Sequence, residues 1–204
     1  NLFDPATETF SRYQHNPENP YSLSNNTVRA IFADKAGILW IGTDGGLNKF
    51  DLDSSIFRHF QHNPADEHSL SDNTVRTIFE DQDGMLWLAT EGGGLNKFDP
   101  ASEIFTHYRH NPDQPNSLSH DDLSAILQDR TGKLWISAEG GGLNKFDPVA
   151  ETFTVYRNDL NDPASLSDDN ISYIYWDRSG QLWVGTRDGL NRFDPATATA
   201  VHYF

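Results

Sequence analysis

The side chains that could do chemistry in this sequence stand where four copies of one phrase disagree. The first copy reads "LWIGTDGGLNKFD", and the position after Thr43 is acidic in three copies and basic in the fourth. Residues on which the copies agree serve the scaffold, whereas the scaffold does not dictate the variable ones. Groups of this kind could hydrogen-bond to the hydroxyls of a sugar or to another protein. The variable candidates are Asp44, Glu91, Glu139, Arg187 and Asp188 in the glycine turn, and Asn26, Arg29, Arg76, Asp121 and Asp169 in a second stretch upstream of it.

Motifs for catalysis are absent from the sequence. It contains no G-x-S-x-G, no H-E-x-x-H, no phosphate loop and no dinucleotide fingerprint. The carboxylates that do recur stand in a D-x-x-G pattern, which is typical of tight turns. We therefore expect no catalytic residue and a protein that is not an enzyme. The recurring carboxylates are those of Asp34, Asp81, Asp129 and Asp177.

Metal and cofactor sites are not indicated either. "DQDG" at 81–84 has the beginning of a calcium loop, but the remaining ligands and the distal glutamate are missing. Three histidines recur in "HNP", at His15, His62 and His110, and Asn158 takes this place in the fourth copy. Equivalent residues of successive repeats lie too far apart to share one ion. We interpret the histidines as polar residues that open a turn.

The composition excludes several classes of partner. The chain of 204 residues has a formal net charge of −15, so it repels phosphate backbones and anionic lipid headgroups. No apolar run is long enough for a membrane span. The chain has no cysteine, which excludes disulfides, thiol nucleophiles and Cys-ligated metals. We expect no nucleic-acid binding and no membrane insertion. Because the chain begins at Asn1, we interpret it as a processed or excised segment.

Internal repetition dominates the sequence. Trp40, Trp87, Trp135 and Trp183 are separated by 47 or 48 residues, and a period in the forties is typical of propellers or solenoids. Each copy contains four short segments rich in β-branched and aromatic residues, separated by Asp-x-x-Gly, glycine-rich and Asp-Pro turns. Four-stranded units of this size bury both faces when they are arranged radially. The sequence therefore predicts an all-β chain, a β-propeller of four four-stranded blades.

Large aromatic residues are expected to pack these blades together. One buried aromatic side chain contributes roughly 2 to 3 kcal/mol through apolar burial. We predict a structural role, and no contact with a ligand, for residues that recur in all four copies. They are Trp40, Trp87, Trp135, Trp183, Phe50, Phe98, Phe146 and Phe193.

The repeat also resembles a known family. "NNTVRAIFADKAGILWIGTDGGLNKFD" at 25–51 is similar to the two-component regulator propeller repeat, with its Asn-x-Val, Asp-x-x-Gly, Leu-Trp-Ile-Gly-Thr, Gly-Leu and Phe-Asp elements. The resemblance covers all four copies and implies a periplasmic or extracellular sensor propeller of bacterial hybrid two-component sensor kinases, some of which recognise oligosaccharides. In the family the kinase lies elsewhere in the polypeptide. The present chain has fewer blades than family propellers, and its second and third copies replace Gly-Thr by Ala89-Thr90 and Ser137-Ala138.

The propeller connectivity places both variable sets on one rim. The connection between blades and the connection between the second and third strands of a blade lie on the same face, so the polar candidates should surround one end of the central shaft. Trp176 is expected near them as an aromatic platform. The predicted ligand is an oligosaccharide or a protein, bound without turnover. The alternatives are a structural module that joins chains and a propeller lyase or glycosidase.

The two ends of the chain carry copies of the same outer hairpin. Asn1–Gln14 matches the third and fourth strands of a blade, and Asn191–Phe204 ends on the same two strands. Only one such hairpin fits the closing blade. Either the segment is cut from a longer array, or the surplus hairpin packs elsewhere, or it pairs with another chain to give a homo-oligomer through blade edges. The predicted units are a half-blade at 1–16 and, within one propeller over 1–204, blades at about 21–66, 69–114, 117–162 and 165–204.

Overall fold

Each repeat folds into one antiparallel four-stranded sheet, in a computed structural model that describes residues 1–204. The prediction of an all-β propeller chain with four four-stranded blades is confirmed. No helix is long and apolar enough to cross a membrane. We call the four sheets blades A to D. Blade A comprises β3 (Val28–Ala33), β4 (Leu39–Thr43), β5 (Gly46–Asp51) and β6 (Ile56–Phe60).

The remaining sheets follow the same order from the inner to the outer strand. Blade B comprises β7 (Val75–Glu80), β8 (Leu86–Thr90), β9 (Leu95–Asp99) and β10 (Ile104–Tyr108). Blade C comprises β11 (Leu123–Gln128), β12 (Leu134–Ala138), β13 (Gly142–Asp147) and β14 (Thr152–Tyr156). Blade D comprises β15 (Ile171–Trp176), β16 (Leu182–Thr186), β17 (Gly189–Asp194) and β18 (Thr199–Tyr203). A separate two-stranded hairpin, β1 (Leu2–Asp4) and β2 (Thr9–Ser11), precedes them.

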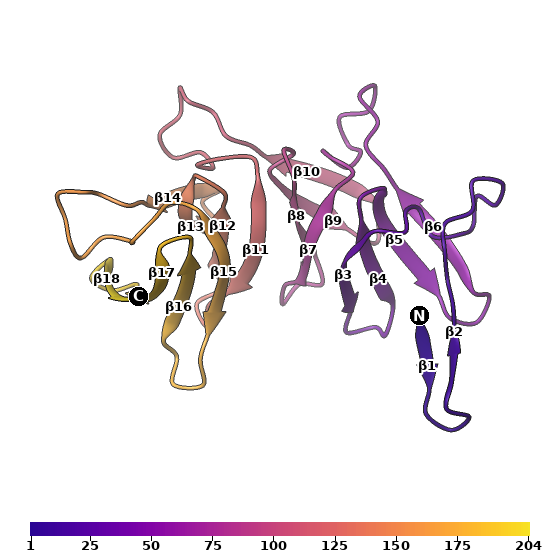
Figure 1. The fold of residues 1–204 in the computed structure, drawn as a ribbon. Helices are drawn as coiled ribbons and strands as arrows, with labels where there is room; N and C mark the ends of the chain where they lie inside the picture. The colour runs from indigo at the N-terminus through magenta and orange to yellow at the C-terminus, as the bar shows by residue number, and fades with distance from the viewer.

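The blades stand side by side along an open arc (Figure 1). Contacts between inner strands run from β3 to β7, from β7 to β11 and from β11 to β15, and none joins β15 back to β3. The hairpin β1–β2 and the C-terminal strand β18 lie at opposite ends of the row. Each blade therefore contacts only its neighbours, and no other blade of this chain covers the outer faces of blades A and D, although Tyr13 packs on Phe50 of blade A.

The Asp-x-x-Gly turn ties each inner hairpin to its tryptophan. In blade B, Oδ1 of Asp81 accepts the main-chain N–H groups of Asp83 and Met85, and Oδ2 accepts the indole N–H of Trp87 at 2.8 Å. Gly84 takes the positive φ of 81° that closes this turn. The same indole-to-carboxylate bond occurs in every blade, at 2.8 to 3.0 Å. One carboxylate therefore shapes the turn and satisfies the polar atom of a buried ring.

Each tryptophan packs against the next blade. Trp87 of blade B meets Phe146 of blade C edge-on, with ring centroids 5.5 Å apart, and Trp40 and Trp135 repeat this contact with Phe98 and Phe193. Trp40, Trp87 and Trp135 are at most 1% exposed. Trp183 of blade D has no following blade and packs on Tyr203 of its own sheet, at 5.7 Å. The recurring tryptophans of blades A to C therefore pack neighbouring blades together.

The connection between blades is held by conserved side-chain pairs of the repeat. Asn96 lies fully buried on β9, where its Oδ1 accepts the main-chain N–H of Ser71 and its Nδ2 donates to Ser71 Oγ at 2.7 Å. The histidine of "HNP" also holds this connection, because Nδ1 of His62 donates to the carbonyl of Leu70 at 2.8 Å. Asn158 replaces this histidine with an amide that donates to the carbonyl of Leu166. These side chains hold the connecting loop through hydrogen bonds to its carbonyl groups.

Substitution of Asp81 tests the turn. In Asp81→Asn, an NH2 group, which donates and does not accept, replaces one carboxylate oxygen. Either the buried indole N–H of Trp87 or the main-chain N–H groups of the turn therefore lose their acceptor. We expect the free energy of unfolding to fall by about 1 to 3 kcal/mol, as measured by urea denaturation. Asp83→Asn is the matched control in the same turn, since the side chain of Asp83 accepts no hydrogen bond. Equal stability of the two variants would contradict this account.

Candidate functional site

The two variable sets lie together at one end of the blades. In blade A the main-chain N–H of Asp44 donates to the carbonyl of Thr27, and in blade B the N–H of Glu91 donates to that of Thr74. Blades C and D repeat the bond from Glu139 to Asp122 and from Arg187 to Asn170. The glycine turn is therefore stapled to the loop that enters the inner strand. We call this end, marked by Asp44, Glu91, Glu139 and Arg187, the rim.

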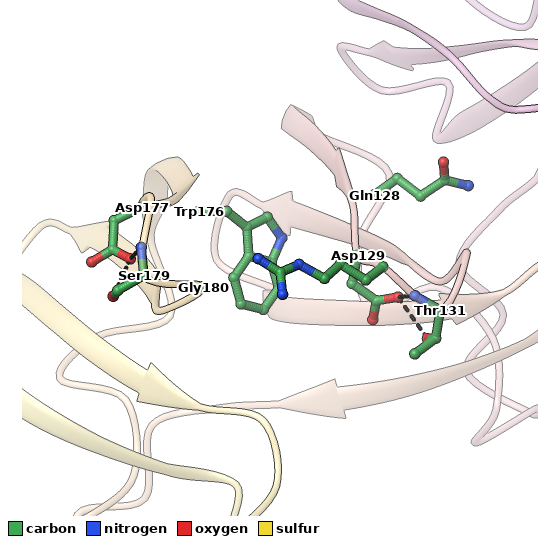
Figure 2. Close-up of a pocket in the computed structure, with 8 residues that line it drawn as sticks. Gln128, Asp129, Thr131, Trp176, Asp177, Ser179 and Gly180 are labelled. Carbon is green, nitrogen blue, oxygen red and sulfur yellow. Dashed lines mark hydrogen bonds between the residues drawn. The ribbon is translucent and has the colours of Figure 1, made fainter.

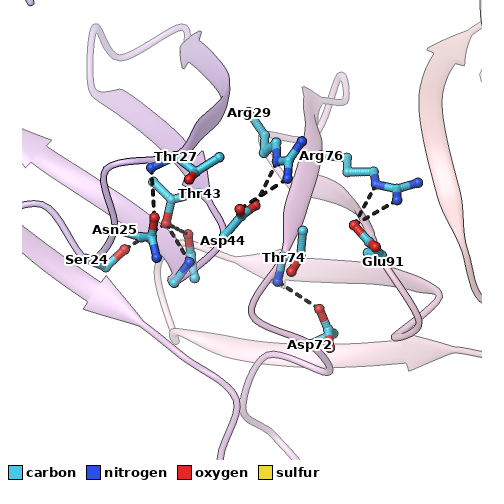
Figure 3. A network of polar contacts seen from close by, with 12 residues as sticks. Ser24, Asn25, Thr27, Arg29, Thr43, Asp44, Asp72, Thr74, Arg76 and Glu91 are labelled. Atoms are coloured by element: carbon cyan, nitrogen blue, oxygen red, sulfur yellow. Dashed lines mark hydrogen bonds and ion pairs between the residues drawn. The ribbon is translucent and has the colours of Figure 1, made fainter.

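Arg29 and Asp44 form a two-pronged ion pair on blade A (Figure 3). Arg29 Nε donates to Asp44 Oδ1 at 2.7 Å, and Nη2 donates to Oδ2 at 3.1 Å. The hydrogen bonds from Arg29 lower the pKa of Asp44 below its usual value, and the bond to Asp44 raises the pKa of Arg29. The pair is preorganised, because planar guanidinium and carboxylate groups match in geometry.

Arg76 extends this charge pattern across two blades. Its Nη2 lies 2.7 Å from Glu91 of blade B, and its Nη1 lies 3.4 Å from Glu139 of blade C. Burial opposes ionisation of Arg76, but the two carboxylates raise its pKa overall. Figure 3 shows Arg29 and Arg76 on neighbouring inner strands, each pointing at the acid of its own glycine turn. Acidic and basic groups therefore alternate along the rim of blades A to C.

The other predicted candidates divide into two groups. Arg187 and Asp188 are exposed at the rim of blade D, and no ion pair engages them. In contrast, Oδ1 of Asn26, Asp121 and Asp169 accepts the main-chain N–H of the residue eleven positions earlier, at 2.7 to 2.8 Å. These three side chains hold the connecting loop, so they contribute to the scaffold of the rim.

Trp176 does not lie at the rim, contrary to the expectation from the sequence. It ends β15, where it pairs with Leu182, whereas the rim lies at the other end of this hairpin, where Ile171 pairs with Thr186. The prediction placed both ends of the inner strand near the rim, although the strand runs from the rim to the opposite end of the blade. A strand of six residues spans about 20 Å, so its last residue belongs to the opposite end of the blade.

Trp176 instead lines a hollow between blades C and D (Figure 2). The hollow has a volume of about 390 Å³ and lies between the turn that follows β11 and the turn that follows β15. Asp129, Arg130 and Thr131 line it from blade C, and Asp177 and Ser179 from blade D. Arg130 is not among the residues predicted from the sequence. A signal for this end of the blade was present, because Trp176 stands where the other three copies have a small or polar residue.

The rim and the hollow differ in chemistry, and neither contains a metal-binding cluster. No group of three or more His, Asp or Glu residues is placed to hold an ion. The aspartates of the hollow are occupied by their own turns, since each accepts two main-chain N–H groups, a hydroxyl and an indole N–H. Hydrogen bonds, led by the hydroxyl of Ser179, lower the pKa of Asp177 strongly. Both ends can therefore bind through hydrogen bonds and charge.

Comparison with known proteins identifies the repeat. The family described as two component regulator propeller matches residues 22–45, 69–92 and 165–188. Each matched stretch runs from the loop that enters the inner strand to the glycine turn of the rim. These three stretches are two-component regulator propeller repeats. The resemblance inferred from the sequence is confirmed for the first, second and fourth copies. Histidine kinase P4 of Formosa agariphila is 39% identical over 46 residues, which are 22% of this chain and 3% of that protein.

Extracellular domains of known structure share the fold of this chain. The extracellular domain of BT3049 from B. thetaiotaomicron, described as a hybrid two component system, has a TM-score of 0.80 and 29% identity over 89% of this chain. The extracellular domain of BT4673 from the same organism, described as a one component system, has a TM-score of 0.76 and 27% identity over 98% of this chain. This chain covers 25% and 27% of those two chains.

The likeness extends to other propellers at the level of fold alone. Virginiamycin B lyase from Staphylococcus aureus has a TM-score of 0.63 and 17% identity over 87% of this chain. BT3049 and BT4673 are more similar in sequence and in structure, and both structures are extracellular domains, one of a hybrid two component system and one of a one component system. The expected periplasmic or extracellular location is confirmed by this comparison. The chain has the repeats and the fold of an extracellular sensor domain.

The ion pair of blade A gives a test of rim electrostatics. In the folded state Arg29 lowers the pKa of Asp44, so the pair stabilises the protein fully above the unfolded pKa of about 3.9 and loses this contribution as the pH falls through the lower folded pKa. In Arg29→Gln we expect the pKa of Asp44, followed by NMR of its side-chain carboxyl, to rise toward about 3.9. Arg192→Gln, which removes an unpaired arginine of β17, should leave it unchanged. An equal effect of both variants would mean that net charge, not the pair, sets this pKa.

Proposed function

We propose that this two-component regulator propeller is a non-enzymatic recognition module that binds a carbohydrate or a protein at its rim. The observation that carries the proposal is the alternation of Asp44, Arg29, Glu91, Arg76 and Glu139 over three successive blades. Such a row presents acceptors and donors along one line. An extended ligand with many hydroxyl or amide groups fits it better than a compact one does.

The exposure of these groups leaves them open to a ligand. The side chains of Glu91 and Glu139 are 46% and 61% exposed, although both contact Arg76. Each carboxylate therefore keeps lone pairs for sugar hydroxyls or for main-chain N–H groups. On blade D, Tyr173 is exposed near the rim end of β15, where it pairs with Gly185. An aromatic ring beside hydrogen-bonding groups suits a pyranose face as well as a protein side chain.

A glycan array followed by calorimetry tests recognition at the rim. Neutral and acidic oligosaccharides are first screened, and the best binder is titrated into the wild type and into the triple variant D44N/E91Q/E139Q. We expect the triple variant to bind at least about tenfold more weakly, since the loss of one charged hydrogen bond costs about 1.5 to 3 kcal/mol. The control D53N/E67Q/D83N removes the same number of charges from carboxylates that make no hydrogen bond, and it should bind like the wild type.

Three results would count against carbohydrate recognition at the rim. Unchanged affinity of the triple variant for an oligosaccharide that binds the wild type would move the site elsewhere. Absence of binding across the array, combined with a protein partner whose affinity falls in the triple variant, would assign the rim to protein recognition. Turnover of the oligosaccharide during the titration would replace recognition by catalysis.

A second candidate function is self-association, which the uncovered faces of blades A and D favour. Ile31 on β3 is 65% exposed and Tyr175 on β15 is 51% exposed, whereas their counterparts at the internal contacts between blades are more buried. Trp183 and Tyr175 line an apolar depression on the face of blade D. The face of blade A offers the residues that receive a tryptophan elsewhere, such as Phe50. Two copies of the chain could thus stack head to tail.

The terminal hairpin would control this stacking. Tyr13, which follows β2, packs edge-on against Phe50 with ring centroids 4.9 Å apart, in the manner of Phe60 against Phe98 at 5.0 Å. Tyr203 of a second copy needs the same place, because it is the counterpart of Tyr13 in blade D. A docking copy must therefore displace either hairpin β1–β2 or its own outer strands.

Light scattering over a hundredfold range of concentration tests self-association. We expect the mass to rise above 23.0 kDa in the wild type and to stay at the monomer value in Tyr175→Glu, because a charge on this face is costly to bury. Tyr21→Glu is the control, since Tyr21 is exposed but lies in the loop before blade A. A wild-type protein that stays monomeric throughout would remove this candidate.

A further inference from the structure

The contact of blades C and D differs at this end from the contact of blades A and B, although the same repeat positions form both. At the A–B contact, the main-chain N–H of Lys35 donates to Oε2 of Glu80 at 3.0 Å, and Nζ of Lys35 donates to the carbonyl of Asp81 at 2.6 Å. Lys35 follows the turn aspartate of blade A, and Glu80 ends the inner strand of blade B. The carboxylate of Glu80 in blade B thus contacts the turn of blade A that contains Lys35.

At the C–D contact this acid is missing. In the repeat register, Arg130 takes the place of Lys35, and Trp176 takes the place of Glu80. The guanidinium of Arg130 has no carboxylate within 4.0 Å, and its main-chain N–H has no partner. Its Nη2 reaches across to blade D, 3.8 Å from the point where a side chain on Gly180 would begin. The turn N–H that binds a carboxylate at the A–B contact is therefore present without its carboxylate, and the guanidinium of Arg130 beside it has no acidic partner.

Trp176 adds an unused donor and an aromatic surface to these groups. Its Nε1 is the one buried side-chain polar atom of the chain without a hydrogen-bond partner. Its ring meets Trp135 edge-on, with centroids 6.1 Å apart, and also lines the hollow. A buried N–H without a partner is rare in native structures and is costly when nothing accepts it. The four scaffold tryptophans all have a carboxylate acceptor, so Trp176 is distinct from them.

We propose that this hollow binds a carboxylate carried on a ring. The carboxylate takes the place that Glu80 has at the A–B contact, where it accepts hydrogen bonds from the main-chain N–H and the guanidinium of Arg130. The ring lies against the indole of Trp176, and the hydroxyls of Thr131 and Ser179 stand beside it. A glycuronate sugar and an aromatic acid share this chemistry. The site lies at the end of the blades opposite the rim, so it is independent of the rim ligand.

The electrostatic surroundings set the strength of this binding. Asp129 and Asp177 stay ionised well into acid because hydrogen bonds within their turns hold their pKa values low, against the effect of burial in the case of Asp129. Their charges oppose an incoming anion, as does the net charge of −15. Their lone pairs are occupied by donors of their own turns, so neither aspartate captures Arg130. We therefore expect a dissociation constant on the order of 1 mM.

NMR of the indole N–H of Trp176 gives a direct readout. Sodium glucuronate and sodium benzoate are titrated into the ¹⁵N-labelled chain at fixed ionic strength, with glucose and benzyl alcohol as the neutral counterparts. We expect a saturable shift of the Trp176 signal, which is assigned by its loss in Trp176→Phe, with one or both acids and not with the neutral compounds. The acid that binds more tightly separates a sugar source of the carboxylate from an aromatic source.

Three variants make the test specific. Arg130→Gln should weaken the binding of the acid by about tenfold or more. Arg178→Gln is the matched control, because it changes the same repeat position on blade D, which has no following blade, and it should leave binding unchanged. Trp176→Glu restores the acid found at the A–B contact; it should keep the fold and abolish binding by placing an internal carboxylate on Arg130. Because this variant lacks the Trp176 indole, its binding is followed by the main-chain amide signal of Arg130.

The proposal is overturned by any of three results. They are a saturable shift with the neutral compounds equal to that with the acids, binding of the acid by Arg130→Gln as tight as by Arg178→Gln, and wild-type affinity in Trp176→Glu. The rim triple variant D44N/E91Q/E139Q should bind the acid like the wild type. Loss of the acid in that variant would contradict two separate sites, whereas failure of rim recognition leaves this site untouched.

Discussion

The hydrogen bond from an indole N–H to a turn carboxylate is the interaction on which the rest of this structure depends. A tryptophan buried between two sheets supplies a large apolar contact, but its N–H needs an acceptor in the same place. Asp34, Asp81, Asp129 and Asp177 provide that acceptor while they close the hairpin beside it. The aspartate thus both closes the hairpin and supports the packing of the tryptophan between blades. This explains why the aspartate and the tryptophan recur together.

Much of the fold could be predicted from the sequence because the repeat states each local requirement four times. The period, the tryptophan spacing and the glycine turns defined the number and order of strands. What the sequence did not reveal was the partner of each polar side chain. In the sequence, Asn96 and His62 are recognisable only as polar residues. The structure shows the backbone groups with which they form hydrogen bonds. Such contacts join strands and loops to backbone groups elsewhere along the chain, and their geometry is not encoded in spacing.

The candidate sites show the same division between pattern and geometry. Disagreement among copies located the variable residues of the rim, but it did not separate Arg29, which pairs with an acid, from Asn26, which supports a loop. The same pattern predicted Trp176 at the rim, whereas the length of the inner strand carries this residue to the opposite end of the blade. Comparison of equivalent contacts was more informative than comparison of equivalent residues, since only the structure shows that Lys35 and Glu80 meet.

The arrangement in a row has a consequence for motion. Blades B and C are supported on both sides, whereas blade D has one neighbour and its tryptophan is less buried than the other three. In a stack where energy is shared only between adjacent units, opening begins at the ends and moves inward. The slowest amide exchange therefore belongs to β8 and β12, so the middle of the row is its rigid reference and the last blade its most compliant part.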